Sequence, residues 1–300
     1  MGNDIQMRLE RCLSFISFAW FATSALGFPG TGIDPAKVKQ ISWKPRAFVY
    51  EGLLTDLECD HLISLAKPEM KRSSVVNHDG KGGRISEVRT STGMFISKGK
   101  DEIVARIEQK IATWTFIPVE NGEPIQVLRY EYGQKYDAHH DFFEKEHSDH
   151  LARGGNRMAT VLMYLSDVTS GGETVFPSAE EPLHRRASEI NQTLSECAQV
   201  GVAVKPRKGD ALLFFSLNAD SIPDSLSLHG GCPVIEGEKW SATKWIRQGQ
   251  FDRIIRRGSE CADFNERCAE WAASGECDKN PNYMIGSQGS CRKSCHACKL

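Results

Sequence analysis

The sequence predicts a mostly β domain with flanking helices at its N-terminal side, followed by a small disulfide-rich C-terminal module. Short apolar runs at 159–165, 211–217 and 240–246 are separated by Gly, Pro and Asp turns, which is the pattern of an all-β domain. Two helical patterns precede these runs. Six of the ten cysteines fall in the last forty residues, a density typical of a module too small to form a core without disulfides.

The chain begins with a membrane-directed segment, residues 1–28. Arg8 and Arg11 precede an apolar stretch from 12 to about 28. This stretch fits either a cleaved signal peptide or a slightly short signal anchor that spans the membrane. A linker that contains Gly and Pro follows at 29–42.

Two helices are expected before the β domain. The first spans 55–67, where Thr55 or Asp56 provides the N-terminal cap and Pro68 follows the end. The second spans about 101–113, because its isoleucines recur on one helical face. We assign a packing role to both.

A candidate metal site is indicated by the motif Tyr-Asp-Ala-His-His-Asp-Phe-Phe at 136–143 and by a lone downstream histidine, His229. Two imidazoles and one carboxylate on one side of an ion leave the opposite positions open, as in non-haem Fe(II) oxygenases. In a strand, His139 and Asp141 share a face and His140 points away. We therefore predict His139, Asp141 and His229 as ligands. A zinc hydrolase is disfavoured because no His-Glu-x-x-His array is present.

A further strand is expected at 237–246. Its period of two places Lys239, Ser241, Thr243 and Trp245 on one face. A lysine on the inner face requires an anion, because an unpaired buried ammonium costs several kcal/mol. The carboxylate of a cosubstrate would supply that anion. The alternative is an edge strand with Lys239 in water.

Residues 43–252 contain six stretches that, in this order, resemble the catalytic domain of prolyl 4-hydroxylases, most closely those of plants and green algae. A single stretch would be a weak signal, whereas the ordered set covers most of the domain. The stretches are 87–95, 136–143, 157–166, 171–177, 205–215 and 229–246.

The resemblance implies a double-stranded β-helix, a jelly-roll of two sheets with flanking helices. It implies that His139, Asp141 and His229 hold Fe(II). The implied activity is of the procollagen-proline 4-dioxygenase type, in which peptidyl proline becomes 4-hydroxyproline and 2-oxoglutarate becomes succinate and CO2. L-ascorbate is the further cofactor of such enzymes, and O2 is the second cosubstrate.

The same resemblance implies a 2-oxoglutarate site. Its far carboxylate would meet Lys239, with Thr174 as a hydrogen-bond partner and Tyr130 as a further contact. The expected substrates are proline-rich polypeptides of the secretory pathway or cell wall, bound as polyproline II segments in an aromatic-lined groove.

Tyr136, Arg157 and Trp245 are candidates to face the substrate or cosubstrate. The alternative for the two aromatic residues is core packing. Arg157 requires an acidic or carbonyl-rich partner, because a cation beside an apolar strand is costly. Two other functions remain open: a non-catalytic peptide-binding protein with an interaction module, and a 2-oxoglutarate oxygenase that acts on another residue.

The C-terminal module, 261–298, follows a basic linker at 253–260 and resembles the ShK toxin-like (ShKT) domain. Sequence alone allows fifteen pairings of its six cysteines, and a zinc cluster that uses 295–298 is a competing interpretation. We expect an accessory or interaction role. The resemblance implies the pairs Cys261–Cys298, Cys268–Cys291 and Cys277–Cys295, and, in the catalytic domain, Cys197–Cys232.

The expected location follows from the cysteines and from the resemblance. Disulfides require an oxidising compartment, and related plant enzymes are commonly type II membrane proteins. We therefore expect a signal anchor in the endoplasmic reticulum membrane with a lumenal catalytic domain; the alternative is a cleaved signal peptide and a lumenal or secreted protein. Asn191 is an expected glycosylation site. A net charge of -2 without a basic patch argues against nucleic-acid binding. The oligomeric state is not indicated.

Overall fold

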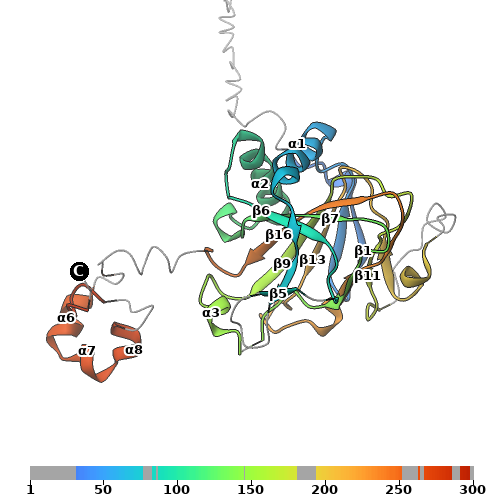
Figure 1. The fold of residues 1–300 in the computed structure, drawn as a ribbon. Coiled ribbons are helices and arrows are strands. Elements are labelled where there is room, and N and C mark those ends of the chain that lie inside the picture. The colour runs from blue at the N-terminus through green and yellow to red at the C-terminus, as the bar shows by residue number, and fades with distance from the viewer. Residues whose placement is uncertain are drawn as a thin grey trace, which may run out of the picture.

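The computed structural model describes residues 32–76, 83–85, 87–144, 146–180, 194–251, 263, 267–285 and 291–297. Two antiparallel sheets form the body of the β domain (Figure 1). In the order in which they pair, the eight strands of the larger sheet are β1 (Val38–Ser42), β2 (Ala47–Tyr50), β13 (Ala211–Phe215), β9 (Arg157–Tyr164), β16 (Lys239–Arg247), β7 (Ile125–Tyr130), β6 (Thr92–Ile96) and β3 (Lys71–Arg72).

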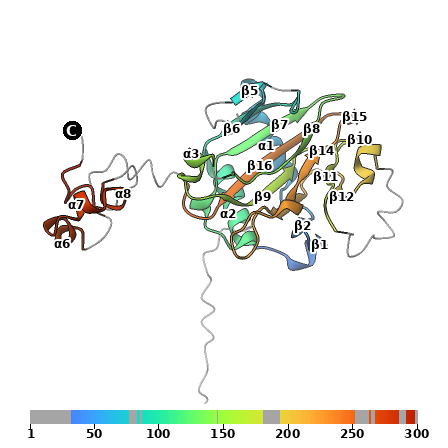
Figure 2. The same ribbon diagram turned by 90° about the horizontal axis from the view of Figure 1, so that it is seen from below.

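The smaller sheet has four strands and lies next to the larger sheet (Figure 2). Two further pairs of strands complete the described β structure. Together the sheets form the double-stranded β-helix that the sequence predicts. The strands of the smaller sheet are β12 (Val202–Val204), β11 (Thr174–Phe176), β14 (His229–Gly231) and β8 (Tyr136–His139), and the two pairs are β10 (Ser170–Gly171) with β15 (Val234–Glu236) and β4 (Ser74–Val76) with β5 (Gly83–Ile85).

Both predicted helices are present. Helix α1 (Asp56–Ala66) begins with a capping box: Thr55 Oγ1 accepts from the Glu58 backbone N–H at 3.2 Å, and Glu58 Oε2 accepts from the Thr55 N–H at 2.9 Å. Helix α2 (Glu102–Thr115) begins after Asp101, whose side chain accepts from the Val104 N–H. Shorter helical turns are η1 (Pro35–Lys37), η2 (Lys67–Glu69), η3 (Val119–Asn121), α3 (Ser148–Leu151), η4 (Glu196–Gln199) and η5 (Ser225–Ser227).

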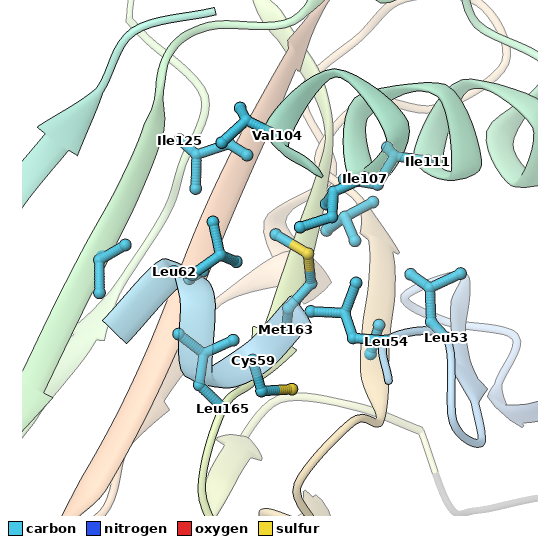
Figure 3. Close-up of a cluster of buried hydrophobic side chains, with 14 of the residues drawn as sticks. Leu53, Leu54, Cys59, Leu62, Val104, Ile107, Ile111, Ile125, Met163 and Leu165 are labelled. Atoms are coloured by element: carbon cyan, nitrogen blue, oxygen red, sulfur yellow. The ribbon is translucent and has the colours of Figure 1, made fainter. Parts of the chain in front are cut away.

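Helices α1 and α2 cover the outer face of the larger sheet. Figure 3 shows Leu62 of α1, Ile107 of α2 and Met163 of β9 meeting in this layer, and all three are 0% exposed. Alternation along β9 and β16 directs every second side chain into this apolar layer. The intervening side chains therefore face the smaller sheet, and these residues form the site described below.

The C-terminal module contains α6 (Cys268–Ala273), α7 (Glu276–Lys279) and α8 (Pro281–Met284). Disulfides join Cys268 to Cys291 and Cys277 to Cys295 around the buried Met284, and a third disulfide, Cys197–Cys232, lies in the β domain. These are three of the four expected pairs. The fourth expected pair, Cys261–Cys298, lies outside the described residues, as do Asn191 and the linker at 253–260.

The expected membrane localisation has to be corrected. A bilayer core of about 30 Å requires about 20 consecutive apolar residues in a helix. Among the residues that the structure describes, no helix combines the necessary length and apolar character, and α2, with 14 residues, falls short of that span. The prediction of a single-pass type II protein of the endoplasmic reticulum membrane is contradicted by this finding. The segment on which it rested, 1–28, lies outside the described residues.

Candidate metal centre

The three predicted metal ligands meet between the two sheets. His139 ends β8, and His229, which begins β14, is its direct partner in the β8–β14 pairing. Asp141 follows β8 by two residues. His139 Nε2 lies 3.6 Å from Asp141 Oδ1, and His229 Nε2 lies 3.7 Å from Asp141 Oδ2. One ligand atom from each residue falls within 4.8 Å of the others, which suits a single ion.

Backbone carbonyls orient both imidazole rings. His139 Nδ1 donates to the Asp137 carbonyl at 2.8 Å, and His229 Nδ1 donates to the Ser227 carbonyl at 2.9 Å. Because a carbonyl only accepts, the proton sits on Nδ1 in each ring, and the Nε2 lone pair is free to bind a metal.

The electrostatics of the cluster favour a cation. Burial of Asp141 by itself would raise the pKa of its carboxyl, but His229 and His139 lower that pKa far below its ordinary value. Burial lowers the pKa of His229 to about 4. Asp141 is thus ionised and His229 neutral at pH 7. Two imidazole nitrogens and one carboxylate are the donor set of non-haem Fe(II) oxygenases, so the residues fit Fe(II).

Lys239 lies in the same cavity and is 3% exposed. Its Nζ donates to the Gly172 carbonyl at 2.7 Å, and burial lowers its pKa to about 8. An ammonium has three N–H donors. Among the described residues, the Gly172 carbonyl is the one acceptor that Lys239 Nζ meets. Gly172 has φ +70, a left-handed conformation that favours glycine. The remaining donors suit a carboxylate.

Tyr130 and Thr174 line the cavity with Lys239. Tyr130 pairs directly with Lys239 between β7 and β16, and the centre of its ring lies 5.5 Å from Lys239 Nζ. The Thr174 hydroxyl accepts from the hydroxyl of Tyr164 at 2.9 Å. The cavity therefore has a metal-binding group of side chains and a cationic, hydroxyl-rich region that could receive a carboxylate.

Two of the three candidate substrate contacts, Tyr136 and Trp245, line the cavity. The ring of Tyr136 stacks on His139, with 3.7 Å between the centroids. Arg157 does not line it. The guanidinium of Arg157 lies behind Trp245, 3.8 Å from the centroid of its ring, and makes two hydrogen bonds to Glu123, at 2.7 and 3.0 Å. Glu123 is thus the acidic partner that Arg157 was expected to need.

His140 does not line the cavity. Its Nε2 hydrogen-bonds to the Ser225 carbonyl at 3.0 Å, and its ring stacks on Phe142. The adjacent histidines therefore occupy different environments.

Sequence reasoning missed several residues of the site. Arg89 lines the cavity, 5% exposed, with its guanidinium 4.6 Å from the centroid of the Tyr136 ring. Thr160 donates to Asp141, and Tyr164 donates to Thr174. The sequence signal for these two residues is that their hydroxyls lie in a strand whose other side chains after Arg157 are apolar. Thr160 and Tyr164 are four residues apart and therefore on the same face.

This fold and donor set define a 2OG-Fe(II) oxygenase. Residues 125–247 match the model of the 2OG-Fe(II) oxygenase superfamily, and residues 260–298 match that of the ShK domain-like family. The chain is 63% identical over 280 residues to Probable prolyl 4-hydroxylase 4 of Arabidopsis thaliana, covering 92% of this chain and 93% of the relative. It is 61% identical to Prolyl 4-hydroxylase 2 of the same organism, with the same coverage. The chain belongs to the prolyl 4-hydroxylase family.

A solved structure is also similar. The viral collagen prolyl hydroxylase vCPH from Paramecium Bursaria Chlorella virus-1, in its 2OG complex, is 27% identical, with 67% of this chain and 94% of that chain covered and a TM-score of 0.48.

Proposed function

We propose that this prolyl 4-hydroxylase acts on proline-rich polypeptides through the cavity between the two sheets. The observation that carries the proposal is the presence of His139, Asp141, His229 and Lys239 in one cavity. A protein that only bound peptides would have no need of a buried lysine beside three metal-ligating side chains.

We assign His139, Asp141 and His229 as the ligands of Fe(II). Their Nε2 and carboxylate atoms lie close enough to share one ion, and the backbone carbonyls keep both rings turned toward it. When bound, Fe(II) and 2-oxoglutarate supply the oxidising chemistry that uses O2 and yields 4-hydroxyproline, succinate and CO2, with L-ascorbate as the further cofactor. The residues of the chain supply binding, orientation and the exclusion of water.

The far carboxylate of 2-oxoglutarate is assigned to Lys239, Thr174 and Tyr130. All three are at most 5% exposed, so a hydrogen bond to the ammonium is shielded from water. Tyr136 and Trp245, near the ligands, are assigned to the face that meets the proline. Arg157 is not assigned to direct contact with the substrate; its guanidinium packs on the Trp245 indole and holds that ring in place.

The domain limits are part of the proposal: a catalytic domain at 43–252 and an accessory ShKT domain at 261–298. The two described disulfides of the module, Cys268–Cys291 and Cys277–Cys295, support a compact unit without zinc, because disulfide-bonded cysteines are not available as ligands. Its partner is not assigned.

The test is incubation of the protein with Fe(II), 2-oxoglutarate, ascorbate and a proline-rich peptide, followed by mass spectrometry and amino-acid analysis. We expect a gain of one oxygen on proline and the release of 4-hydroxyproline on hydrolysis. A matched peptide with alanine at each proline and a lysine-rich peptide are the controls. Oxygen on lysine but not proline would support an oxygenase for another residue, and peptide binding without oxidation would support the non-catalytic alternative.

A further inference from the structure

Tyr164 is a buried phenol behind the cavity wall. It ends β9 and is 0% exposed. Its hydroxyl lies 2.9 Å from Thr174 Oγ1. Burial raises the pKa of the phenol above its ordinary value, so the hydroxyl keeps its proton and can donate it.

The hydrogen bond from Tyr164 limits the directions in which the Thr174 hydroxyl can donate its proton. A threonine hydroxyl has one proton and two acceptor lone pairs. Because Oγ1 accepts from Tyr164, the proton of Thr174 must point elsewhere, and Thr174, 2% exposed, lines the cavity. Its hydroxyl is thereby set as a donor toward a ligand.

Tyr164 also contacts the second group of this region. The Lys239 ammonium lies 5.7 Å from the centroid of the Tyr164 ring, and the Tyr130 ring lies at a similar distance, 5.5 Å. Aromatic faces at this distance attract a cation. The ring of Tyr164 thus contacts the Lys239 ammonium, and the hydroxyl of Tyr164 bonds to Thr174.

We propose that Tyr164 is a positioning residue for 2-oxoglutarate, and that its hydroxyl turns the Thr174 hydroxyl into a donor for the carboxylate that Lys239 binds. The inference rests on the proposed function of the cavity. Tyr164 does not touch the ligand itself; it acts through Thr174.

The test is the affinity for 2-oxoglutarate, measured by calorimetry without oxygen on the Fe(II)-loaded full chain. Tyr164→Phe keeps the ring and removes only the hydroxyl. We expect it to weaken 2-oxoglutarate about 5-fold, because a hydrogen bond to a charged group is lost in part. Thr174→Val should weaken it similarly. The double variant should bind 2-oxoglutarate as tightly as Thr174→Val does, because Thr174→Val has already removed the hydroxyl that Tyr164 orients.

Two controls separate positioning from general loosening. Oxalate chelates iron but has no far carboxylate, so its affinity should be the same in the wild type and in Tyr164→Phe. Tyr50→Phe removes the hydroxyl of another buried tyrosine, which accepts from the Asp34 N–H, away from the cavity. It should leave the 2-oxoglutarate affinity unchanged. The melting temperature of each variant reports whether the fold is retained.

The outcomes distinguish this inference from the function on which it rests. If Lys239→Ala weakens 2-oxoglutarate and Tyr164→Phe does not, the role of Tyr164 is overturned and the site stands. If neither does, the carboxylate site itself is misplaced. Equal weakening of oxalate and 2-oxoglutarate in Tyr164→Phe, or fully additive effects in the double variant, would also overturn the positioning role.

Discussion

The hydroxyl of Thr160 donates to the Oδ2 of Asp141 at 2.7 Å. Thr160 lies on β9 of the larger sheet, whereas His139 and His229 belong to the smaller sheet. The larger sheet therefore positions the carboxylate of Asp141, while the smaller sheet carries the two histidines. The geometry of the three ligands depends on how the two sheets pack against each other.

Replacement of Thr160 by valine keeps the shape of the side chain and removes this donor. We expect Thr160→Val to reduce Fe(II) affinity about 10-fold to 100-fold, as the loss of partners behind metal ligands generally does. Anaerobic titration calorimetry measures it. Thr115→Val is the matched control, because the Thr115 hydroxyl donates to the Ile111 carbonyl and accepts from the Ile117 N–H, and both bonds lie away from the metal ligands. Equal affinity in Thr160→Val and wild type would show that this hydrogen bond does not position Asp141.

The binding of 2-oxoglutarate should weaken above pH 8. Burial lowers the pKa of Lys239 from 10.5 to about 8 in the free protein, and a carboxylate binds the ammonium form. Affinity is therefore full below pH 8 and should fall as pH rises further, by up to about 10-fold per unit. Calorimetry between pH 6.5 and about 9.5 measures it, with oxalate as the ligand control. A flat profile for 2-oxoglutarate would contradict the assignment of Lys239.

The lowered pKa of Lys239 also determines how the stability of the folded protein changes with pH. The pKa of Lys239 is lower in the folded chain than in the unfolded chain, so the unfolded chain binds more protons between about pH 8 and 10.5. The cost of burying the ammonium is present in full below pH 8. It is relieved as pH rises through that window, so removal of the lysine by Lys239→Met should stabilise the ligand-free protein below pH 8.

Glu123 compensates two buried cations. Its carboxylate accepts from Arg157 and from Arg247, whose side chain is 2% exposed. Burial would raise the pKa of Glu123, but the two guanidinium groups lower it, so the carboxylate is charged. Glu123→Gln should destabilise the fold by about 3–5 kcal/mol, because it leaves buried charges unpaired. Urea unfolding measures it.

A surface pair provides the control for Glu123. Glu87 is 93% exposed in its side chain and lies 3.6 Å from Arg72. Solvent screens this pair, so Glu87→Gln should change the free energy of unfolding by less than about 1 kcal/mol. Similar losses in both variants would indicate that the burial of Glu123 has no special consequence.

Local patterns predicted much of the site. The alternation that placed Lys239 and Trp245 on one face of a strand is confirmed, because both line the cavity and the intervening residues pack under the helices. Alternation also separated His139 from His140, although β8 ends at His139 and Asp141 follows the strand. The capping signal at Thr55 is confirmed as well, since a cap depends on neighbouring residues alone.

Tertiary pairing could not be predicted in the same way. The partner of Arg157 is Glu123, 34 residues earlier, and only the folded sheet brings them together. The stacking of Tyr136 on His139 could not be predicted from a period of two either, because the two residues are three positions apart and would face opposite sides of a regular strand. An irregularity in the β8–β14 pairing between His229 and Gly231 shifts the register there and brings the rings together.

The most direct test of the metal site compares two adjacent histidines. We would measure 4-hydroxyproline formed from a proline-rich peptide by His139→Ala and His140→Ala, with bound Fe(II) determined in the same samples. The site predicts that His139→Ala loses bound iron and turnover, whereas His140→Ala, which removes a ring bonded to the Ser225 carbonyl, keeps most of both. Equal loss in the two variants, or turnover retained in His139→Ala, would contradict the account.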